Sequence, residues 1–205
     1  GDGKGTIMAA LAAIGSVGGA WPDGTTAPQF RTLFVLGEEA LDDTLRPRLD
    51  MHGADPEQVF AIETVLDGEG RERFFNVKTH LELLEAALAE HRIDLLVIDP
   101  LTTVMGGSDR NAEGDTRDAL TPLIKLAERL NVAVIGIAHV GKPNGTNRTP
   151  AQRILGATAF HALARVVWMT APDDCKEMAL GVVKSMSYSL CPVARRCKNS
   201  ALERE

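Results

Sequence analysis

Short apolar runs alternate with longer amphipathic stretches along most of this chain, and this alternation restricts the fold more than any other feature of its sequence. The runs are rich in Val, Ile and Leu, which is typical of strands that are buried on both faces of a sheet. The stretches between them are long enough for crossover helices, which allow consecutive strands to lie parallel. The sequence therefore predicts an α/β fold with a mostly parallel central sheet flanked by helices on both faces.

The expected strands all belong to this one sheet and are Thr32–Leu36, Val59–Ile62, Asp94–Ile98, Val132–Ala138, Val166–Met169 and Met178–Lys184. The expected helices have apolar residues at helical spacing and are Thr6–Ser16, Leu41–His52, Leu81–His91 and Asp115–Leu130. Pro122 should bend or break the last of these helices, because proline removes a helical hydrogen bond. Two long polar loops, Gly106–Gly114 and Gly141–Gln152, follow the carboxyl ends of predicted strands, where open parallel sheets bind ligands.

The size and charge of the chain limit its functions. Its 205 residues, 44% of them hydrophobic, fit one domain with a substantial core. No apolar run is long enough to cross a bilayer and no signal peptide is visible, so we expect a cytoplasmic protein without a membrane partner. The net charge of −6 is unusual for a protein that grips duplex DNA, because phosphate neutralisation supplies most of that affinity. Any nucleic-acid contact must therefore be local, weak per subunit or multiplied by oligomerisation.

The first six residues match the second half of a phosphate-binding loop. In the complete motif, backbone N–H groups of a glycine-rich turn face the phosphates, a lysine reaches the β- and γ-phosphates, and a hydroxyl approaches Mg²⁺. The first half of the motif and the strand before it are expected upstream of residue 1. Taken alone, a polar, glycine-rich start is more often a frayed terminus than a nucleotide site. The residues expected to bind the phosphates of ATP are Gly1, Asp2, Gly3, Lys4, Gly5 and Thr6.

This half-motif departs from the usual pattern at one position. The residue after Lys4 is normally Ser or Thr, but here it is Gly5, and the hydroxyl comes one place later at Thr6. The direct contact of Thr6 with Mg²⁺ is therefore less secure than the contact of Lys4 with the phosphates.

Two of the apolar strands end in acids. The run Asp94–Asp99 delivers a carboxylate to the sheet edge, as a Walker B strand delivers an aspartate beside the Mg²⁺ of a bound nucleotide. Asp99 could equally begin an ordinary turn at Pro100. The run that starts at Thr32 ends in Glu38 and Glu39, and an acid placed there can deprotonate the water that attacks the γ-phosphate. Glu38 is the preferred base and Glu39 the second choice, since a solvated first turn of the following helix explains Glu39 better.

A histidine follows a third apolar run. His139, after Val132–Ala138, can hydrogen-bond the γ-phosphate or the attacking water, although a structural histidine at a strand end is nearly as good an explanation. The cations within or beside the two long loops are Arg110, Lys142, Arg148 and Arg153. In an acidic protein these would have to carry any DNA phosphate contacts, and the alternative is solvated loop charge.

The order of these segments resembles the RepA-like ATPases of the RecA superfamily, AAA-type proteins found in plasmid replication helicases and in many phage and mobile-element proteins. The resemblance covers about residues 1 to 185. The segments that carry it are Gly3–Thr6, Glu38–Glu39, Asp43–Leu49, Val97–Leu101, Asp109–Asn111, Asp115–Arg117, His139–Lys142, Gly156–Phe160 and Ala164–Arg165. The ordered set is specific, although no single segment is.

This resemblance implies a RecA-like P-loop fold in a ring, often a hexamer of identical subunits, with ATP held between neighbours. It also implies that Lys4 and Thr6 bind phosphate and Mg²⁺, that Glu38 is the base, and that Asp99 holds Mg²⁺ through water. His139 would then sense the γ-phosphate, and Arg165 would enter the site of the next subunit. The two long loops correspond to the DNA-facing loops of such rings.

The expected domain organisation is an ATPase core at residues 1–187 that lacks its first strand, followed by a tail at 188–205 of unknown role. Cys175, Cys191 and Cys197 lack the spacing of a zinc site or a disulfide framework and are expected to be free thiols. The leading interpretation is an ATPase of the replication-helicase type acting on single-stranded DNA. The alternatives are a non-motor ATP-dependent regulator or adaptor and a nucleotide kinase, although no arginine-rich lid of such a kinase is obvious.

Overall fold

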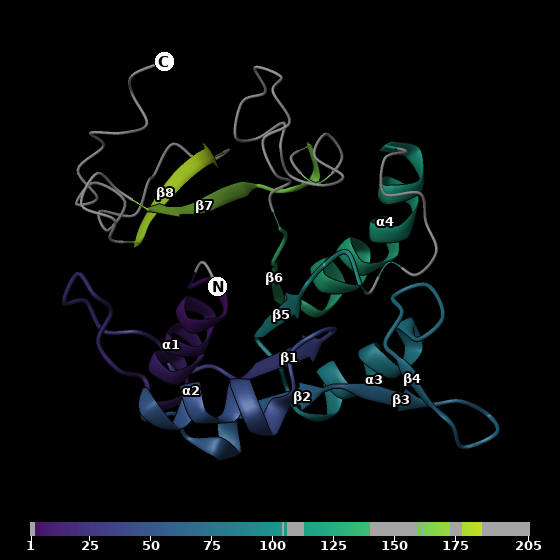
Figure 1. Cartoon of the computed structure of the whole chain (residues 1–205), viewed down its shortest axis with the longest axis horizontal. Coiled ribbons are helices and arrows are strands. Elements are labelled where there is room, and N and C mark those ends of the chain that lie inside the picture. The colour runs from purple at the N-terminus through teal and green to yellow at the C-terminus, as the bar shows by residue number, and fades with distance from the viewer. Residues whose placement is uncertain are drawn as a thin grey trace.

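In the computed structural model, four strands form a central sheet in which each strand is parallel to its neighbours. The structure describes residues 3–103, 105, 113–139, 160, 162–172 and 178–185. The order across the sheet is β2 (Val59–Ile62), β1 (Thr32–Leu36), β5 (Leu95–Asp99) and β6 (Ala133–Gly136). The predicted α/β class with a parallel sheet is therefore confirmed (Figure 1).

Helices cover both faces of this sheet, and the alternation of side chains along each strand decides which helix a residue meets. Phe34 and Val97 pack in one cluster with apolar residues of the N-terminal helices. Leu33 and Leu96, one residue earlier on the same strands, pack in the opposite cluster with residues of the later helices. The α-helices are α1 (Lys4–Val17), α2 (Arg46–Met51), α3 (Leu81–Glu90) and α4 (Glu113–Leu130).

The first helix approaches the sheet closely because its inward side chains are small. Ala9, Ala12 and Ala13 on α1 are almost completely buried. Gly15 leaves room for an aromatic ring, since a Cβ at this position would lie 2.0 Å from Cζ of Phe30. The N-terminal end of α1 lies beside the residues that follow β1, since a Cβ on Gly5 would lie 3.4 Å from Oε2 of Glu39.

The segment expected to be one helix over Leu41–His52 is divided in two. A π-helical turn, η1 (Leu41–Leu45), leads directly into α2, which ends at Met51. Pro47 lies in the first turn of α2, where its missing N–H costs no hydrogen bond. A 3₁₀ turn, η2 (Pro56–Gln58), then precedes β2.

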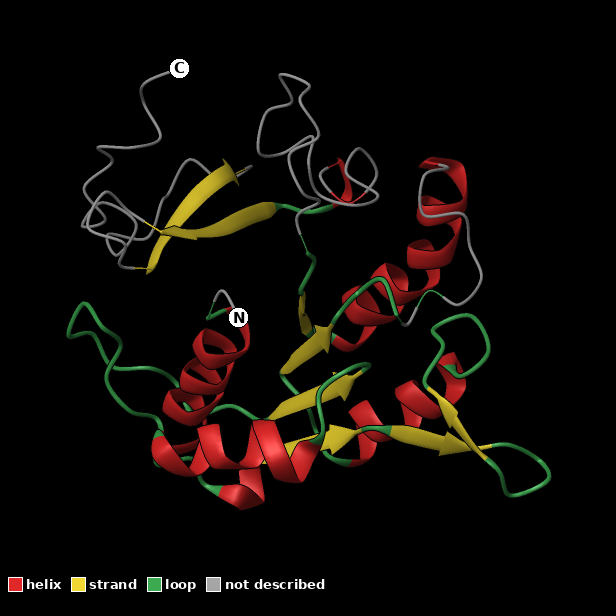
Figure 2. Cartoon of the chain, viewed as in Figure 1, coloured by secondary structure: helices red, strands yellow, loops and turns green. Residues whose placement is uncertain are grey.

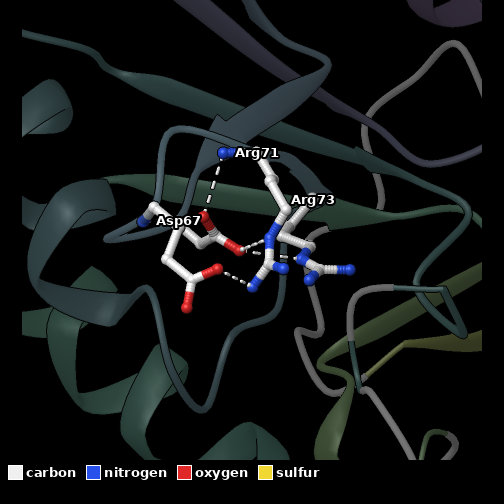
Figure 3. Close-up of polar contacts among 4 residues, drawn as sticks. Asp67, Arg71 and Arg73 are labelled. Carbon is white, nitrogen blue, oxygen red and sulfur yellow. Dashed lines mark hydrogen bonds and ion pairs between the residues drawn. The ribbon is translucent and has the colours of Figure 1, made fainter.

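A small antiparallel hairpin, β3 (Thr64–Leu66) and β4 (Glu72–Phe74), was not anticipated from the sequence. Its turn is organised by Asp67, whose carboxylate accepts hydrogen bonds from the backbone N–H groups of Glu69 and Arg71. The guanidinium groups of Arg71 and Arg73 also donate to Asp67, at 3.2 and 3.1 Å (Figure 3). The backbone bond from Arg71 is the largest cause that lowers the pKa of Asp67. Single-sequence patterns missed this hairpin because each strand has only three residues.

The expectation that the last two strands complete the central sheet is wrong. Strands β7 (Val166–Pro172) and β8 (Met178–Ser185) pair with each other in an antiparallel hairpin (Figure 2). Within the described residues neither strand pairs with the four-stranded sheet. The two strands are adjacent in sequence and satisfy each other's backbone groups locally, an option that strand propensity alone does not reveal.

The expected boundaries of the last helix also change. Helix α4 begins at Glu113, so Glu113 and Gly114 are helical and do not belong to the preceding loop. The helix runs through Pro122 to Leu130 without a break. Residues of this helix, including Leu120 and Leu123, are buried against the sheet, and this tertiary packing outweighs the helix-breaking tendency of the proline.

Candidate functional site

The carboxyl ends of three neighbouring strands meet at one edge of the sheet and are joined by backbone hydrogen bonds. The N–H of Gly37, just after β1, donates to the carbonyl oxygen of Asp99 at 2.8 Å. After β6, the N–H of Ile137 donates to Ile98 O at 2.9 Å, and the N–H of Leu101 donates to Ile137 O at 2.7 Å. The side chains that immediately follow these strands therefore lie at a common edge, which is the ligand-binding edge of open parallel sheets.

The pKa of Asp99 is sensitive to the charged groups that lie near it at this edge. This pKa is raised from 3.8 to about 6, mainly by burial and next by the negative charge of Glu39, with a smaller contribution from Glu38. The positive charges of His139 and Lys4 act in the opposite direction. The structure thus brings together five residues that the sequence analysis named from four separate segments.

The start of α1 is shaped to present backbone N–H groups. Gly3 adopts a left-handed conformation, with φ 72° and ψ 0°, which glycine accepts without steric cost. Its carbonyl oxygen accepts the first helical hydrogen bond, from the N–H of Ile7 at 3.0 Å. Gly3 has no side chain that could cap the next N–H groups, and the first turn of the helix contains no acid. Such a helix start favours a bound anion.

The two acids that follow β1 have different surroundings. The carboxylate of Glu39 is half-buried and accepts a hydrogen bond from Nη1 of Arg48 at 2.7 Å. Glu38 is exposed and, in the part of the chain that the structure describes, makes no hydrogen bond or ion pair. An exposed, unpaired carboxylate can accept a proton from water, whereas a paired one is already engaged. The contrast agrees with the choice of Glu38 over Glu39, which stays a prediction.

Gly37 is a site-forming residue that the sequence analysis missed. A Cβ at this position would lie 2.7 Å from Cβ of Thr103 and 3.2 Å from Cδ of Pro100. The end of β1 therefore packs directly against the turn that follows Asp99, whose peptide bond to Pro100 is cis. A glycine between an apolar strand and two acids was the available signal, because close backbone approach often requires glycine.

The remaining predicted site residues are exposed or lie outside the described residues. Thr6 is exposed on the first turn of α1. Nη2 of Arg165 lies 3.8 Å from Oε1 of Glu128, and both side chains are mostly exposed. Exposed pairs of this kind contribute at most about 1 kcal/mol. The predicted residues whose structure is not described are Gly1, Asp2, Arg110, Lys142, Arg148 and Arg153.

The fit of this edge to Mg²⁺ depends on the donors that the chain supplies. Among the described residues there is no group of three or more His, Cys, Asp or Glu side chains placed to hold a metal by themselves. Mg²⁺ bound with a nucleotide takes most of its ligands from phosphates and water and needs only one or two carboxylates. Asp99 suits that role because a nearby cation would offset the burial and the like charges that raise its pKa.

A parallel sheet that gathers three acids and a histidine opposite a glycine-led helix beginning with lysine defines a P-loop protein that binds nucleoside triphosphates. A family model described as an AAA domain matches residues 1–145, which is 145 of the 205 residues. The chain belongs to this AAA domain family, and the family is one of ATPases that bind and hydrolyse nucleotide, typically with Mg²⁺. A comparison with curated proteins finds no match. No described helix is long and apolar enough to span a membrane.

Proposed function

We propose that this AAA domain is the ATP-hydrolysing subunit of a RecA-like ring, of the RepA-like type, which works on DNA in replication or in a mobile element. The observation that carries the proposal is the grouping of Lys4, Glu38, Asp99 and His139 at one edge, around a helix start suited to phosphate. The hexameric ring, the DNA substrate and the helicase activity are supported by the family resemblance of the sequence.

In this mechanism each residue has a separate task. Lys4 and the N–H groups at the start of α1 would bind the phosphates, and Asp99 would hold the Mg²⁺ that accompanies them. Mg²⁺, when bound with ATP, neutralises charge on the phosphate oxygens. Glu38 accepts a proton from a water molecule whose oxygen bonds to the γ-phosphorus, while the bond from that phosphorus to the bridging oxygen of ADP breaks. His139 hydrogen-bonds the γ-phosphate or the attacking water and so distinguishes ATP from ADP.

A non-motor ATP-dependent regulator or adaptor is the second candidate. The net charge of −6 favours it, because a protein that translocates on DNA needs phosphate contacts. In the motor, Lys142 and Arg148 on the second long loop would supply such contacts. These residues lie outside the described residues, so their role rests on the sequence.

ATPase assays of the full-length protein with and without single-stranded DNA, at two salt concentrations, separate these candidates. A motor should show DNA-stimulated hydrolysis with a steep salt dependence of DNA binding. Replacing Lys142 and Arg148 with Ala should reduce the salt slope by about one unit per lost contact. ATP hydrolysis that DNA leaves unchanged would favour the regulator, and phosphate transfer to a nucleoside monophosphate would instead indicate a kinase.

A further inference from the structure

Gly5 lies directly against the side chain of Arg48. A Cβ on Gly5, in the first turn of α1, would lie 2.5 Å from Nη1 of Arg48 and 3.4 Å from Oε2 of Glu39. The guanidinium of Arg48, from α2, therefore occupies the space in which other phosphate-binding loops place a Ser or Thr side chain. Because Nη1 is the far end of a flexible side chain, a group added at residue 5 would displace the guanidinium without disrupting the fold.

The same guanidinium holds an acid of the site. Nη1 of Arg48 lies 2.7 Å from Oε2 of Glu39, and both side chains are only about a quarter to a third exposed, at 26% and 32%. A charge-assisted hydrogen bond in such surroundings is stronger than a surface pair. Glu39 is also close enough to Asp99 for its charge to act on that carboxyl group. Arg48 thus links the start of α1, the acid after β1 and the end of β5.

We propose that Arg48 is a positioning residue of the phosphate-binding turn. Its guanidinium pairs with the carboxylate of Glu39 beside Gly5 and neutralises that charge. Glu38 is then left as the unpaired acid that faces the nucleotide. The proposal rests on the ATP-binding function proposed above. Its physical reason is charge: without Arg48, the carboxylate of Glu39 would stand uncompensated beside the place of a polyanion.

The experiment measures the Kd of a fluorescent ATP analogue with Mg²⁺ in the full-length protein. Arg48→Ala should weaken binding roughly 10-fold or more, because an unpaired negative charge then faces the phosphates. Adding Glu39→Gln to Arg48→Ala should restore the Kd to within about threefold of wild type, since the charge is removed. Glu39→Gln alone should bind at least as tightly as wild type. A purely structural role for Arg48 would not predict rescue by loss of the carboxylate charge.

Two further variants keep the test sharp. Arg46→Ala is the matched control, because Arg46 lies two residues earlier and pairs on the exposed surface with Asp50 at 2.9 Å. It should leave the Kd unchanged. Gly5→Ala keeps Arg48 but displaces its guanidinium, so it should weaken binding and be rescued by Glu39→Gln in the same way. Gly5→Ala also tests the proposal if the Arg48→Ala variant proves unstable.

The outcomes separate this inference from the proposed function. A wild-type protein that binds no ATP analogue would contradict the proposed function itself. A wild-type protein that binds, combined with an Arg48→Ala variant of equal affinity or one that Glu39→Gln fails to rescue, would overturn the role of Arg48 and leave the ATPase function intact.

Discussion

At the scale of single residues, the site depends on giving different tasks to acids that are close in space. Glu38 and Glu39 are adjacent in sequence, but only Glu39 has Arg48 as a partner. Asp99 is partly buried on the neighbouring strand, and the negative charges of both glutamates raise its pKa. Three carboxylates at one edge repel one another, and such repulsion is common where a site is prepared for cations or for proton transfer.

We expect Glu38→Gln to keep ATP binding and lose hydrolysis, because the amide fills the same space and cannot accept the proton of the attacking water. The loss should be about 10²-fold or more in kcat. Single-turnover hydrolysis and analogue binding, measured on the same full-length samples, check both parts. Glu39→Gln should lose much less, since its amide oxygen can still accept from Arg48. If Glu39→Gln were the slow variant and Glu38→Gln stayed active, the assignment of the base would be wrong.

The raised pKa of Asp99 predicts how stability depends on pH. Its pKa is about 6 in the folded protein and 3.8 when the carboxyl group is fully solvated, as in the unfolded chain. The folded state therefore binds this proton more tightly. The stability that this contributes is complete below pH 3.8 and is lost as the pH rises through 6. Asp99→Asn should therefore stabilise the nucleotide-free protein at pH 7, by at most about 3 kcal/mol. The same substitution should weaken Mg²⁺-dependent ATP binding.

Urea denaturation of wild type and Asp99→Asn between pH 4 and pH 8 checks this expectation. The stabilising effect should grow from pH 4 to about pH 7 and then level off. A difference that stays constant over this range would mean that Asp99 does not titrate as described. Asp94→Asn is a suitable control, because Asp94 lies at the opposite end of the β5 segment and its carboxylate accepts from the Arg31 N–H.

At the scale of elements, the site depends on how tightly strand ends pack against the turns beside them. Gly37, the residue after β1, packs against Pro100 and Thr103, and its N–H donates to Asp99 O. The end of β1 is thereby joined to the end of β5 by a backbone hydrogen bond and by the close packing at Gly37. This arrangement sets the separation between the acid after β1 and Asp99.

Gly37→Ala should destabilise the protein by about 1–3 kcal/mol, because the new Cβ would overlap a β-branched residue that cannot move without the turn. Urea denaturation measures the change, and the ATP analogue should bind more weakly as the turn shifts. Gly68→Ala is the matched control: nothing lies within 4 Å of its Cβ position, so its effect should stay within about 0.5 kcal/mol. Equal stability of the two variants would contradict the close packing at Gly37.

At the scale of the whole molecule, the proposed ring would complete the site with a second subunit. Within the described residues, Arg165 makes one ion pair, a long and exposed contact with Glu128 at 3.8 Å. This contact does not occupy the guanidinium strongly, so it remains able to reach the γ-phosphate of a neighbour in the proposed ring. An arginine supplied in this way contributes roughly 10³- to 10⁵-fold in rate in other P-loop proteins.

We expect Arg165→Ala to abolish hydrolysis while ATP still binds, because Lys4 and Asp99 are unchanged. The deciding measurement mixes Arg165→Ala subunits with Glu38→Gln subunits, each inactive alone. Some mixed interfaces would pair an intact Glu38 with an intact Arg165, so activity should partly return. Absence of recovery in rings shown to have mixed would mean that Arg165 acts only on its own subunit or on the fold. Glu128→Gln, which removes the exposed contact alone, should retain full activity.

The sequence by itself determined the parallel sheet and the identity of the acids at its edge. Buried parallel strands need continuous apolar runs, and these runs mark β1 and β5 together with the acids at or just beyond their carboxyl ends. Glu38 and Asp99 could be named for this reason, and Lys4 from the glycine-rich half-motif in which it lies. Their proximity also followed from the rule that parallel strands share a carboxyl edge.

Only the tertiary structure decided which acid is paired, which side chain lies against Gly5, and where the last two strands go. Arg48 is nine residues from Glu39 and reaches it only because η1 and α2 turn back over the start of α1. The pairing of β7 with β8 and the packing of Gly37 likewise depend on contacts between separate segments. Local propensity and periodicity do not predict such contacts, because each contact depends on the space that another segment of the chain leaves.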